Sequence, residues 1–227
     1  GFEGPIREAC LDIIEAYRAG TDHGIKMDPA DGLIAAGDPS SQLTWMDAKR
    51  DGVVFTPRHG KPVEINALWH HGLLSVAGAI QADDPARAAA MRAMAATAAK
   101  SFSAFWNPVL GCCHDVLVPA PGGRWLPDPA VRPNQVFAAS LEHSPLSATQ
   151  RAAVVKRLRD DLLTPAGLRT LAASDPGYRP HYRGRMMERD AAYHNGTVWP
   201  WLLGAYAEAV LRVGGFSDGA KAEARSA

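Results

Sequence analysis

The segment at residues 62–80, PVEINALWHHGLLSVAGAI, decides how the chain is organised. Its apolar side chains lie almost all round a helix of 3.6 residues per turn, whereas a helix on a protein surface has a single apolar stripe. We therefore expect a helix that is buried on both faces. Glu64 lies in its first turn, where a carboxylate complements the positive end of the helix dipole.

The residues just before this helix mix acids, bases and indoles within a short span. The sequence TWMDAKRDGVVFTPRHGK, residues 44–61, places Asp47 after Trp45 and just before a cationic run, and then Arg58 in a turn with glycine and proline. Two later stretches, residues 125–135 and 178–201, concentrate the same types of side chain. If the helices bring these three loops to one rim, the loops line a single pocket.

Helical patterns occupy much of the rest of the chain. Asp84 and Ser147 are suitable N-caps, and Pro200 suits the first turn of the last helix. The expected helices cover residues 5–19, 62–80, 85–105, 133–141, 148–163 and 200–214.

The expected fold class is all-α, with about six helices, a short β-hairpin at residues 24–37 and long loops. The loops at residues 107–131 and 164–196 far exceed the median connection of about 4 to 6 residues, and loops of that length are usually functional. No repeat or shift in composition marks an internal boundary. We expect one domain region over residues 1–216 and a polar tail over residues 217–227.

The composition excludes several classes of partner. Lys and Arg together number 24, as do Asp and Glu, so no global field attracts nucleic acid or anionic lipid. No apolar run approaches the ~20 residues of a membrane-spanning helix, and we see no secretory signal. Three cysteines, two of them adjacent, fit a reducing compartment better than a disulfide framework. We therefore expect a cytoplasmic protein with a neutral ligand, no nucleic acid and no membrane.

The side chains of the three loops suit a carbohydrate. Carboxyl groups supply an acid and a base, indoles stack on sugar rings, and Arg and Asn bond to hydroxyl groups. A phosphate ligand is disfavoured because the chain has no glycine-rich phosphate loop. The sequence CCHD at residues 112–115 lacks the second ligand pair of a zinc site, and no G-x-S-x-G elbow holds a nucleophilic serine. We expect neither a metal nor an organic cofactor.

Four separated segments together resemble one known family. They are QLTWMDAKRDGVVFTPRHGKPVEINALW (42–69), RPNQVFAASL (132–141), LLTPAGLRTL (162–171) and YHNGTVWPWLLGAYAEA (193–209). These segments are similar, in the same order, to the C-terminal glucosidase domain of glycogen debranching enzymes, the amylo-α-1,6-glucosidase type. The chain differs from that pattern at Asn195, where relatives usually have Gln. It differs also at Val198, near which eukaryotic members have Glu, so no base is carried over from that position.

The resemblance implies a fold, a partner and a reaction. The family's (α/α)6 toroid has about twelve helices, so we expect the C-terminal part of such a toroid, which works with the remaining N-terminal part of the same enzyme. Such a partial toroid is expected to leave apolar faces uncovered near Val63, Leu68, Leu73 and Val76. The implied partner is glycogen or a branched α-glucan oligosaccharide. The implied reaction is hydrolysis of a single α-1,6-linked glucose with inversion at the anomeric carbon.

Two other functions stay open. The chain is also compatible with a non-catalytic carbohydrate-binding fragment that keeps the pocket surface. It is compatible, too, with a related toroidal hydrolase that acts on another α-glucoside. Substitution of the catalytic acid distinguishes the two: an enzyme would lose turnover and keep its sugar binding, whereas a binding fragment has no turnover to lose.

Asp47 is the expected general acid, because it occupies the family's acid position in Thr-Trp-Met-Asp. An acid must be protonated near neutral pH, and an apolar wall such as Trp45 would raise the pKa of this carboxyl by desolvation. The alternative for Asp47 is a helix cap or an ion pair with Lys49 or Arg50.

Glu188 is our first candidate for the base that activates water. It lies in the long loop before the last helix, where toroidal glycosidases place a base. An ion pair with Arg185 or Arg189 is an equally compatible role, and Asp190 has the same two alternatives.

The other polar and aromatic side chains of the three loops are expected to contact sugar hydroxyl groups or to hold carboxylates in place. At least one of Trp199 and Trp201 is expected to pack in the core instead. The expected substrate-binding residues are Trp45, Arg58, His59, Glu64, Asn66, Arg132, Asn134, Gln135, Asp190, His194 and Trp199.

Overall fold

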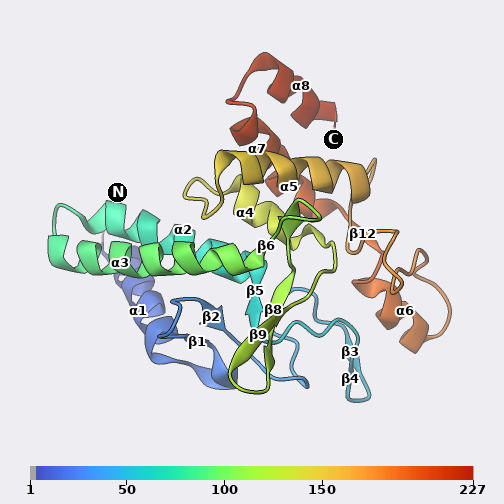
Figure 1. Cartoon of the computed structure of the whole chain (residues 1–227), viewed down its shortest axis with the longest axis horizontal. Helices are drawn as coiled ribbons and strands as arrows, with labels where there is room; N and C mark the ends of the chain where they lie inside the picture. Colours follow the sequence, from blue (N-terminus) through green and yellow to red (C-terminus); the bar gives the residue numbers. More distant parts are fainter. Residues whose placement is uncertain (1–3, 227) are drawn as a thin grey trace.

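The computed structural model describes residues 4–226, and the chain is mostly helical (Figure 1). Eight α-helices and five small β-sheets occur within these residues. The helices are α1 Pro5–Ala19, α2 Val63–Ile80, α3 Pro85–Ser101, α4 Val136–Ser140, α5 Ala148–Asp161, α6 Met186–Tyr193, α7 Leu203–Val213 and α8 Asp218–Ser226. Short 3-10 turns lie at Asp22–Gly24, Phe102–Phe105, Pro133–Gln135 and Pro200–Leu202.

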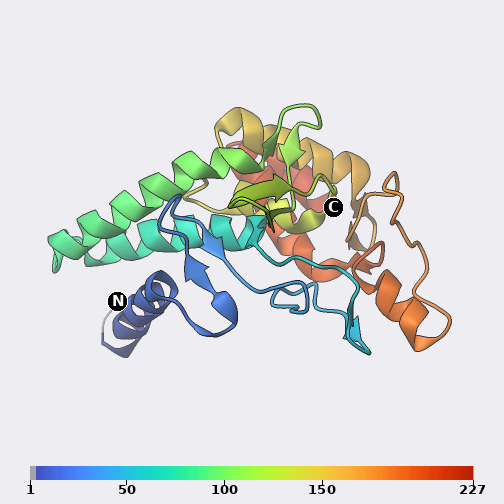
Figure 2. The same cartoon turned by 60° about the horizontal axis from the view of Figure 1, so that its bottom comes forward.

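Helix α2 is the central element and has many buried residues, but the prediction of a helix buried on both faces is wrong, because Leu68, Ser75 and Ala79 form an exposed stripe. Val63, Ala67 and Leu73 are fully buried. Helix α3 lies along α2 in both views (Figures 1 and 2), where its small side chains Ala88 and Ala95 are buried and permit a close approach. The N-terminal end of α2 points into the middle of the molecule and carries Glu64 there.

A second group of helices packs beside the first. Helix α4 contacts α2, α5 and α7, and α8 packs against α7. Ser147 begins α5 with a capping box, in which its hydroxyl accepts from the Gln150 backbone and the Gln150 side chain accepts from the Ser147 backbone. Residues 218–226 lie in the segment expected as a polar tail; they form α8, and Ala220 is buried against the neighbouring helix.

Five small sheets connect the helices. The expected hairpin is confirmed as strands β1 and β2. The loops expected at residues 107–131 and 164–196 are only partly irregular, because they contain paired strands and helix α6. The sheets are β1 Lys26–Met27 with β2 Ile34–Ala35; β3 Lys49–Arg50 with β4 Val53–Val54; β5 Lys61–Pro62, β8 Val116–Ala120 and β9 Arg124–Pro127; β6 Trp106–Asn107 with β7 Cys112–Cys113; and β10 Leu163–Thr164, β11 Gly167–Arg169 and β12 Val198–Trp199.

Long-range strand pairs bring the polar loops together. Strand β5, just before α2, pairs with β8, so that Pro62 lies opposite Val116. Strand β12 pairs with β11 and places Trp199 opposite Leu168. The first pairing places the start of α2 beside the chain around Asp115, and the second places the segment after α6 beside β11.

The uncovered apolar surface differs from the expectation. Val63 and Leu73 are fully buried and Val76 is nearly so, but Leu68 is 41% exposed. An apolar groove lies between α1 and α2, and Cys10, Ile13, Leu68 and Trp69 contribute to its lining. Leu73 and Val76 also line this groove, so the uncovered surface lies near three of the four named residues, and the expectation was wrong for Val63, which takes no part in it.

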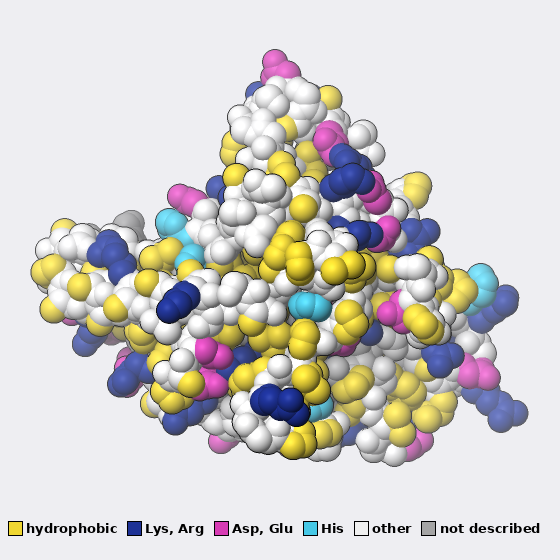
Figure 3. All heavy atoms as spheres, viewed as in Figure 1, with side chains coloured by type: hydrophobic (Ala, Val, Ile, Leu, Met, Phe, Trp, Pro, Cys, Tyr) yellow, Lys and Arg dark blue, Asp and Glu magenta, His cyan; other side chains and the backbone are white. Residues whose placement is uncertain are grey.

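The outer surface is mixed in charge. Figure 3 shows basic and acidic side chains interspersed over one face of the molecule, in keeping with the zero net charge of the sequence. No helix among residues 4–226 combines the length and the apolar character needed to cross a membrane.

Candidate functional site

An aromatic cluster forms where the first and last of the three loops meet. Trp45 makes edge-on contacts with the rings of His194 at 5.2 Å, Trp201 at 5.0 Å and Trp199 at 6.0 Å between centroids. Trp201 is 48% exposed, whereas Trp199 is partly buried and its Nε1 donates to the carbonyl oxygen of Tyr193. The cluster therefore has an inner side and a side that faces solvent.

The middle loop joins the cluster through one amide. Asn134 Oδ1 accepts a 2.7 Å hydrogen bond from Trp45 Nε1, and Asn134 Nδ2 lies 3.5 Å from the sulfur of Met46. Gln135 stabilises the same turn, since its Oε1 accepts from the Cys113 backbone and its Nε2 donates to the carbonyl oxygen of Arg132. All three predicted loops thus contribute to one region of the molecule.

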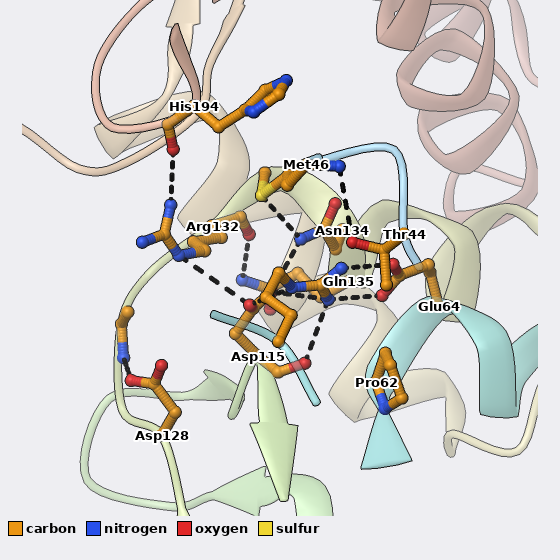
Figure 4. Close-up of polar contacts among 12 residues, drawn as sticks. Thr44, Met46, Pro62, Glu64, Asp115, Asp128, Arg132, Asn134, Gln135 and His194 are labelled. Atoms are coloured by element: carbon orange, nitrogen blue, oxygen red, sulfur yellow. Dashed lines mark hydrogen bonds and ion pairs between the residues drawn. The ribbon is translucent and has the colours of Figure 1, made fainter. Parts of the chain in front are cut away.

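A buried network of two cations and two anions lies beneath this region (Figure 4). Arg58 forms paired hydrogen bonds of 2.5 and 2.6 Å with Glu64, and its Nε donates to Asp115 Oδ2 at 2.6 Å. Arg132 Nε lies 3.8 Å from the same Asp115 oxygen. Burial alone would lower the pKa of Arg58, but Asp115 and Glu64 outweigh this effect and raise the pKa above its ordinary value.

Arg132 connects the network to the last loop. Its Nη1 donates to the carbonyl oxygens of Thr170 and His194, at 3.1 and 2.7 Å, and its Nη2 donates to Asn195 Oδ1 at 2.9 Å. Burial lowers the pKa of this guanidinium, an effect that the Asp115 carboxylate opposes. Arg132 therefore holds the turn that carries His194, a role that was not predicted from the sequence.

His194 is buried in the aromatic cluster. Its ring stacks on Trp199 with centroids 5.9 Å apart, and its Nδ1 is buried with no hydrogen-bond partner among the described residues. Burial lowers the pKa of His194 to about 4; the Asp47 carboxylate opposes this shift, whereas Arg132 and Arg58 add to it. Asp47 is thus close enough to His194 for their charges to interact.

Asp47 itself is exposed to solvent. The apolar wall expected to desolvate it is present as Trp45, but that indole does not bury the carboxyl group in this structure. Asp47 lies two residues after the indole bound by Asn134 and one residue after Met46, which is only 1% exposed. The neighbours of Asp47 in the chain are therefore anchored while its own side chain is accessible.

The two candidate bases have contacts of their own. Glu188 is exposed in the first turn of α6, and its Oε2 accepts a 2.7 Å bond from the Arg185 backbone nitrogen. Asp190 is ion-paired with Arg50 of β3, which ties the β3–β4 hairpin to α6. The partner of Asp190 is thus neither Arg185 nor Arg189.

The remaining predicted residues lie around this region in different settings. Asn66 is fully buried, where its amide bonds to the Ile34 backbone and to the carbonyl oxygen of Pro62. His59 is partly buried, and its Nδ1 has no partner among residues 4–226. Together with Thr44 and Met46, His59 lines a small cavity of about 80 Å³ beside the network.

Asp115 was not among the predicted site residues, although it is the central anion of the network. Its signal in the sequence was the CCHD motif, which sequence analysis considered only as a metal-site fragment. In the structure Cys112 and Cys113 are buried, and burial raises the pKa of the Cys113 thiol above its ordinary range. No group of three or more potential metal-ligating side chains occurs within the described part of the chain.

Comparisons with known proteins agree with this arrangement. The amylo-alpha-1,6-glucosidase family matches residues 6–226. The glycogen debranching enzyme of Saccharomyces cerevisiae is 27% identical over 236 aligned residues, which cover 85% of this chain and 15% of the yeast protein. The chain thus spans a small part of the length of that relative. The match over nearly the whole sequence shows that the chain belongs to the amylo-alpha-1,6-glucosidase family.

Proposed function

We propose that this chain forms part of the sugar-binding and catalytic site of a cytoplasmic glycoside hydrolase that removes α-1,6-linked glucose from branched α-glucans such as glycogen. Family membership supports a role related to debranching. The single observation that carries the mechanism is the accessible Asp47 beside the anchored aromatic cluster of Trp45, His194 and Trp199. The helices would belong to an (α/α)6 toroid, with further segments of the enzyme completing its rim.

Asp47 would act as the general acid in this reaction. A sugar bound on the exposed side of the cluster would cover the carboxyl group and remove water from it, which raises a carboxyl pKa. The protonated acid would then donate to the oxygen of the leaving glucan as the glycosidic bond breaks. The buried charges beneath it are paired with each other, so the pocket presents a nearly neutral floor to a neutral sugar.

Glu188 would be the base in an inverting reaction, activating water on the opposite face of the sugar. In this role its carboxylate would release the Arg185 backbone nitrogen or share it with the water. Asp190 is less suited to the task, because Arg50 already neutralises it. His194, Arg58 and Arg132 would shape the sugar pocket, with Arg58 and Arg132 acting through the side chains and turns that they hold.

A specific observation favours a second candidate, a carbohydrate-binding fragment without catalysis. Both candidate bases are engaged in contacts that stabilise α6, Glu188 as an N-terminal cap and Asp190 in an ion pair. A chain that retained the aromatic cluster and lacked a free base would bind a sugar without hydrolysing it.

The decisive experiment measures binding and turnover separately in the full-length protein that carries this chain. Asp47→Asn should leave the affinity for a branched oligosaccharide largely intact by calorimetry, and should lower glucose release from a limit dextrin by about 10² to 10⁴-fold. Asp12→Asn, an exposed acid on α1, is the matched control. Near-normal turnover in Asp47→Asn would remove Asp47 from the mechanism, and sugar binding by wild type without glucose release would favour the binding fragment.

A further inference from the structure

We propose that Asp115 is a positioning residue, which acts through Asn134 to fix the Trp45 indole and the short segment that carries Asp47. Its expected effect on turnover rests on the proposed glucosidase function, whereas the contacts that carry the proposal do not. Asp115 is buried, with 1% of its side chain exposed, so it acts on a ligand only through other residues.

The chain of hydrogen bonds from Asp115 through Asn134 to Trp45 is called the relay below. The direction of each of its hydrogen bonds follows from the chemistry of the groups. An ionised carboxylate only accepts, and an indole N–H only donates. Asn134 therefore must direct Nδ2 toward Asp115 Oδ1, at 2.7 Å, and Oδ1 toward Trp45 Nε1, also at 2.7 Å. The Asp115 carboxylate thus selects one of the two orientations of the Asn134 amide, and that orientation is the one that binds Trp45.

Asp115 is itself rigidly held. Arg58 donates to both of its carboxylate oxygens, at 2.6 and 3.2 Å, and the second carboxylate on Arg58 is Glu64. All three side chains are at most 4% exposed. Paired charges buried in this way hold one geometry, because any displacement leaves a charge without a partner.

Asn134 transmits this rigidity to the residues before Asp47. Its two polar atoms contact both Trp45 and Met46, the two residues that precede the acid. Asp47 is exposed, so its position depends on those anchored neighbours more than on contacts of its own. A shift of about 1 Å in a catalytic group lowers turnover by about 10²-fold, so a relay of this kind has a measurable effect.

Asp115→Asn is the first test, because an amide cannot satisfy both of its neighbours. When the oxygen of the introduced amide accepts from Arg58, the NH₂ group of that amide faces the NH₂ group of Asn134. When the oxygen accepts from Asn134 instead, the NH₂ group faces the Arg58 guanidinium. We expect the Trp45 indole to lose its bond. Its ¹H–¹⁵N signal, assigned with Trp45→Phe, should shift and exchange faster with solvent, and kcat should fall about 10- to 100-fold with a smaller change in KM.

The swapped variant Asp115→Asn with Asn134→Asp restores the chain of hydrogen bonds from Arg58 to Trp45 and loses only the longer, 3.2 Å bond from Arg58 to position 115. The amide introduced at position 115 is then able to accept from Arg58 and to donate to the carboxylate introduced at position 134. That carboxylate in turn accepts from Trp45, and the charge of the network is unchanged. We expect the swapped variant to return the indole signal and most of kcat toward wild type. This recovery separates a relay from a general loss of stability.

Two controls isolate the relay further. Glu64→Gln also removes one carboxylate that pairs with Arg58, but Glu64 has no contact with Asn134. The Trp45 signal should therefore remain in place. The Trp69 indole, which donates to the carbonyl oxygen of Gly32, should be unaffected in every variant. The indole signals of Trp45 and Trp69 are measured without any turnover. If the wild-type protein has no glucosidase activity, the proposed function is overturned, but these signals still decide whether Asp115 positions Trp45.

An unmoved Trp45 signal in folded Asp115→Asn would overturn the proposal. If Asp115→Asn fails to fold, the swapped variant decides the question: a folded protein with the wild-type Trp45 signal supports the relay, and a displaced signal or failure to fold overturns it.

Discussion

At the level of single residues, His194 combines an ionisable ring with an apolar setting. Trp45, Tyr193 and Trp199 surround the ring, and burial holds its pKa at about 4. The imidazole is therefore neutral at physiological pH. A neutral ring stacks against indoles without the desolvation cost of a charge, and it suits a pocket for a neutral sugar.

We expect the pH dependence of stability to identify this residue. The ordinary pKa of 6.5 applies to the unfolded chain, so the unfolded state binds more protons than the folded state between pH 6.5 and about 4. His194 therefore lowers stability as the pH falls through that window, by at most about 3 kcal/mol. His194→Gln should reduce the difference between the free energies of unfolding at pH 7 and pH 4.5, measured by urea unfolding. His181→Gln, at an exposed position, is the control, and an unchanged slope in His194→Gln would contradict the interpretation.

The residue types of the site were accessible from the sequence, but its geometry was not. Trp45, Arg132, Asn134 and His194 were predicted from the crowding of such side chains in three loops, and the structure brings them together. Asp115 was missed because its partners Asn134 and Arg58 lie 19 and 57 residues away in the chain. No local pattern indicates a carboxylate whose partners come from other loops.

At the level of elements, the segment around Gly196 depends on close backbone contact. Gly196 has a φ of 153°, and a Cβ there would lie 2.2 Å from the carbonyl oxygen of Arg179. Arg179 in turn donates its backbone N–H to the carbonyl oxygen of Asn195 at 2.7 Å. The glycine thus allows the irregular chain before α6 to pack against the turn that carries His194.

Gly196→Ala should lower the free energy of unfolding by about 2 kcal/mol or more, because the new Cβ meets backbone that cannot rotate away. Gly204→Ala is the matched control, since this glycine is exposed in α7 and nothing lies within 4 Å of a Cβ placed there. The control should be stabilised by about 0.4 to 1 kcal/mol. Chemical unfolding measures both changes, and similar values for the two variants would refute the packing argument.

Long helices were predictable and short paired strands were not. The pattern at residues 62–80 depends on periodicity within one segment, so α2 was predicted nearly to its ends. Strands such as β5 and β7 contain two residues each, and their partners lie far away in the sequence or in unexpected hairpins. Helix α6 was missed because Ala192 is the single buried residue among its eight, so the segment has no broad apolar stripe.

At the level of the whole molecule, the apolar groove between α1 and α2 leaves large apolar side chains open to solvent. Ile13 is 54% exposed and Leu68 is 41% exposed at this groove. Contiguous apolar surface of this kind favours association, whereas isolated apolar side chains do not.

We expect this chain alone to self-associate as its concentration rises, and Ile13→Gln combined with Leu68→Gln to shift it toward the monomer. Sedimentation velocity over a range of concentrations measures this change. Val109→Gln provides the control, because Val109 is 89% exposed but contributes nothing to the groove. A wild-type chain that remains monomeric throughout the range would show that the groove is too small to drive association.

The wide sequence separation within the buried charge network has a consequence for synthesis on the ribosome. Arg58 and Asp115 are 57 residues apart, and Arg132 binds His194 another 62 residues on. At about 5 to 20 residues per second, Asp115 is made about 3 to 11 s after Arg58. During that interval the nascent α2 lacks α4, which packs against it in the folded chain. The first part of the chain should therefore bind chaperones until α4 has left the ribosome.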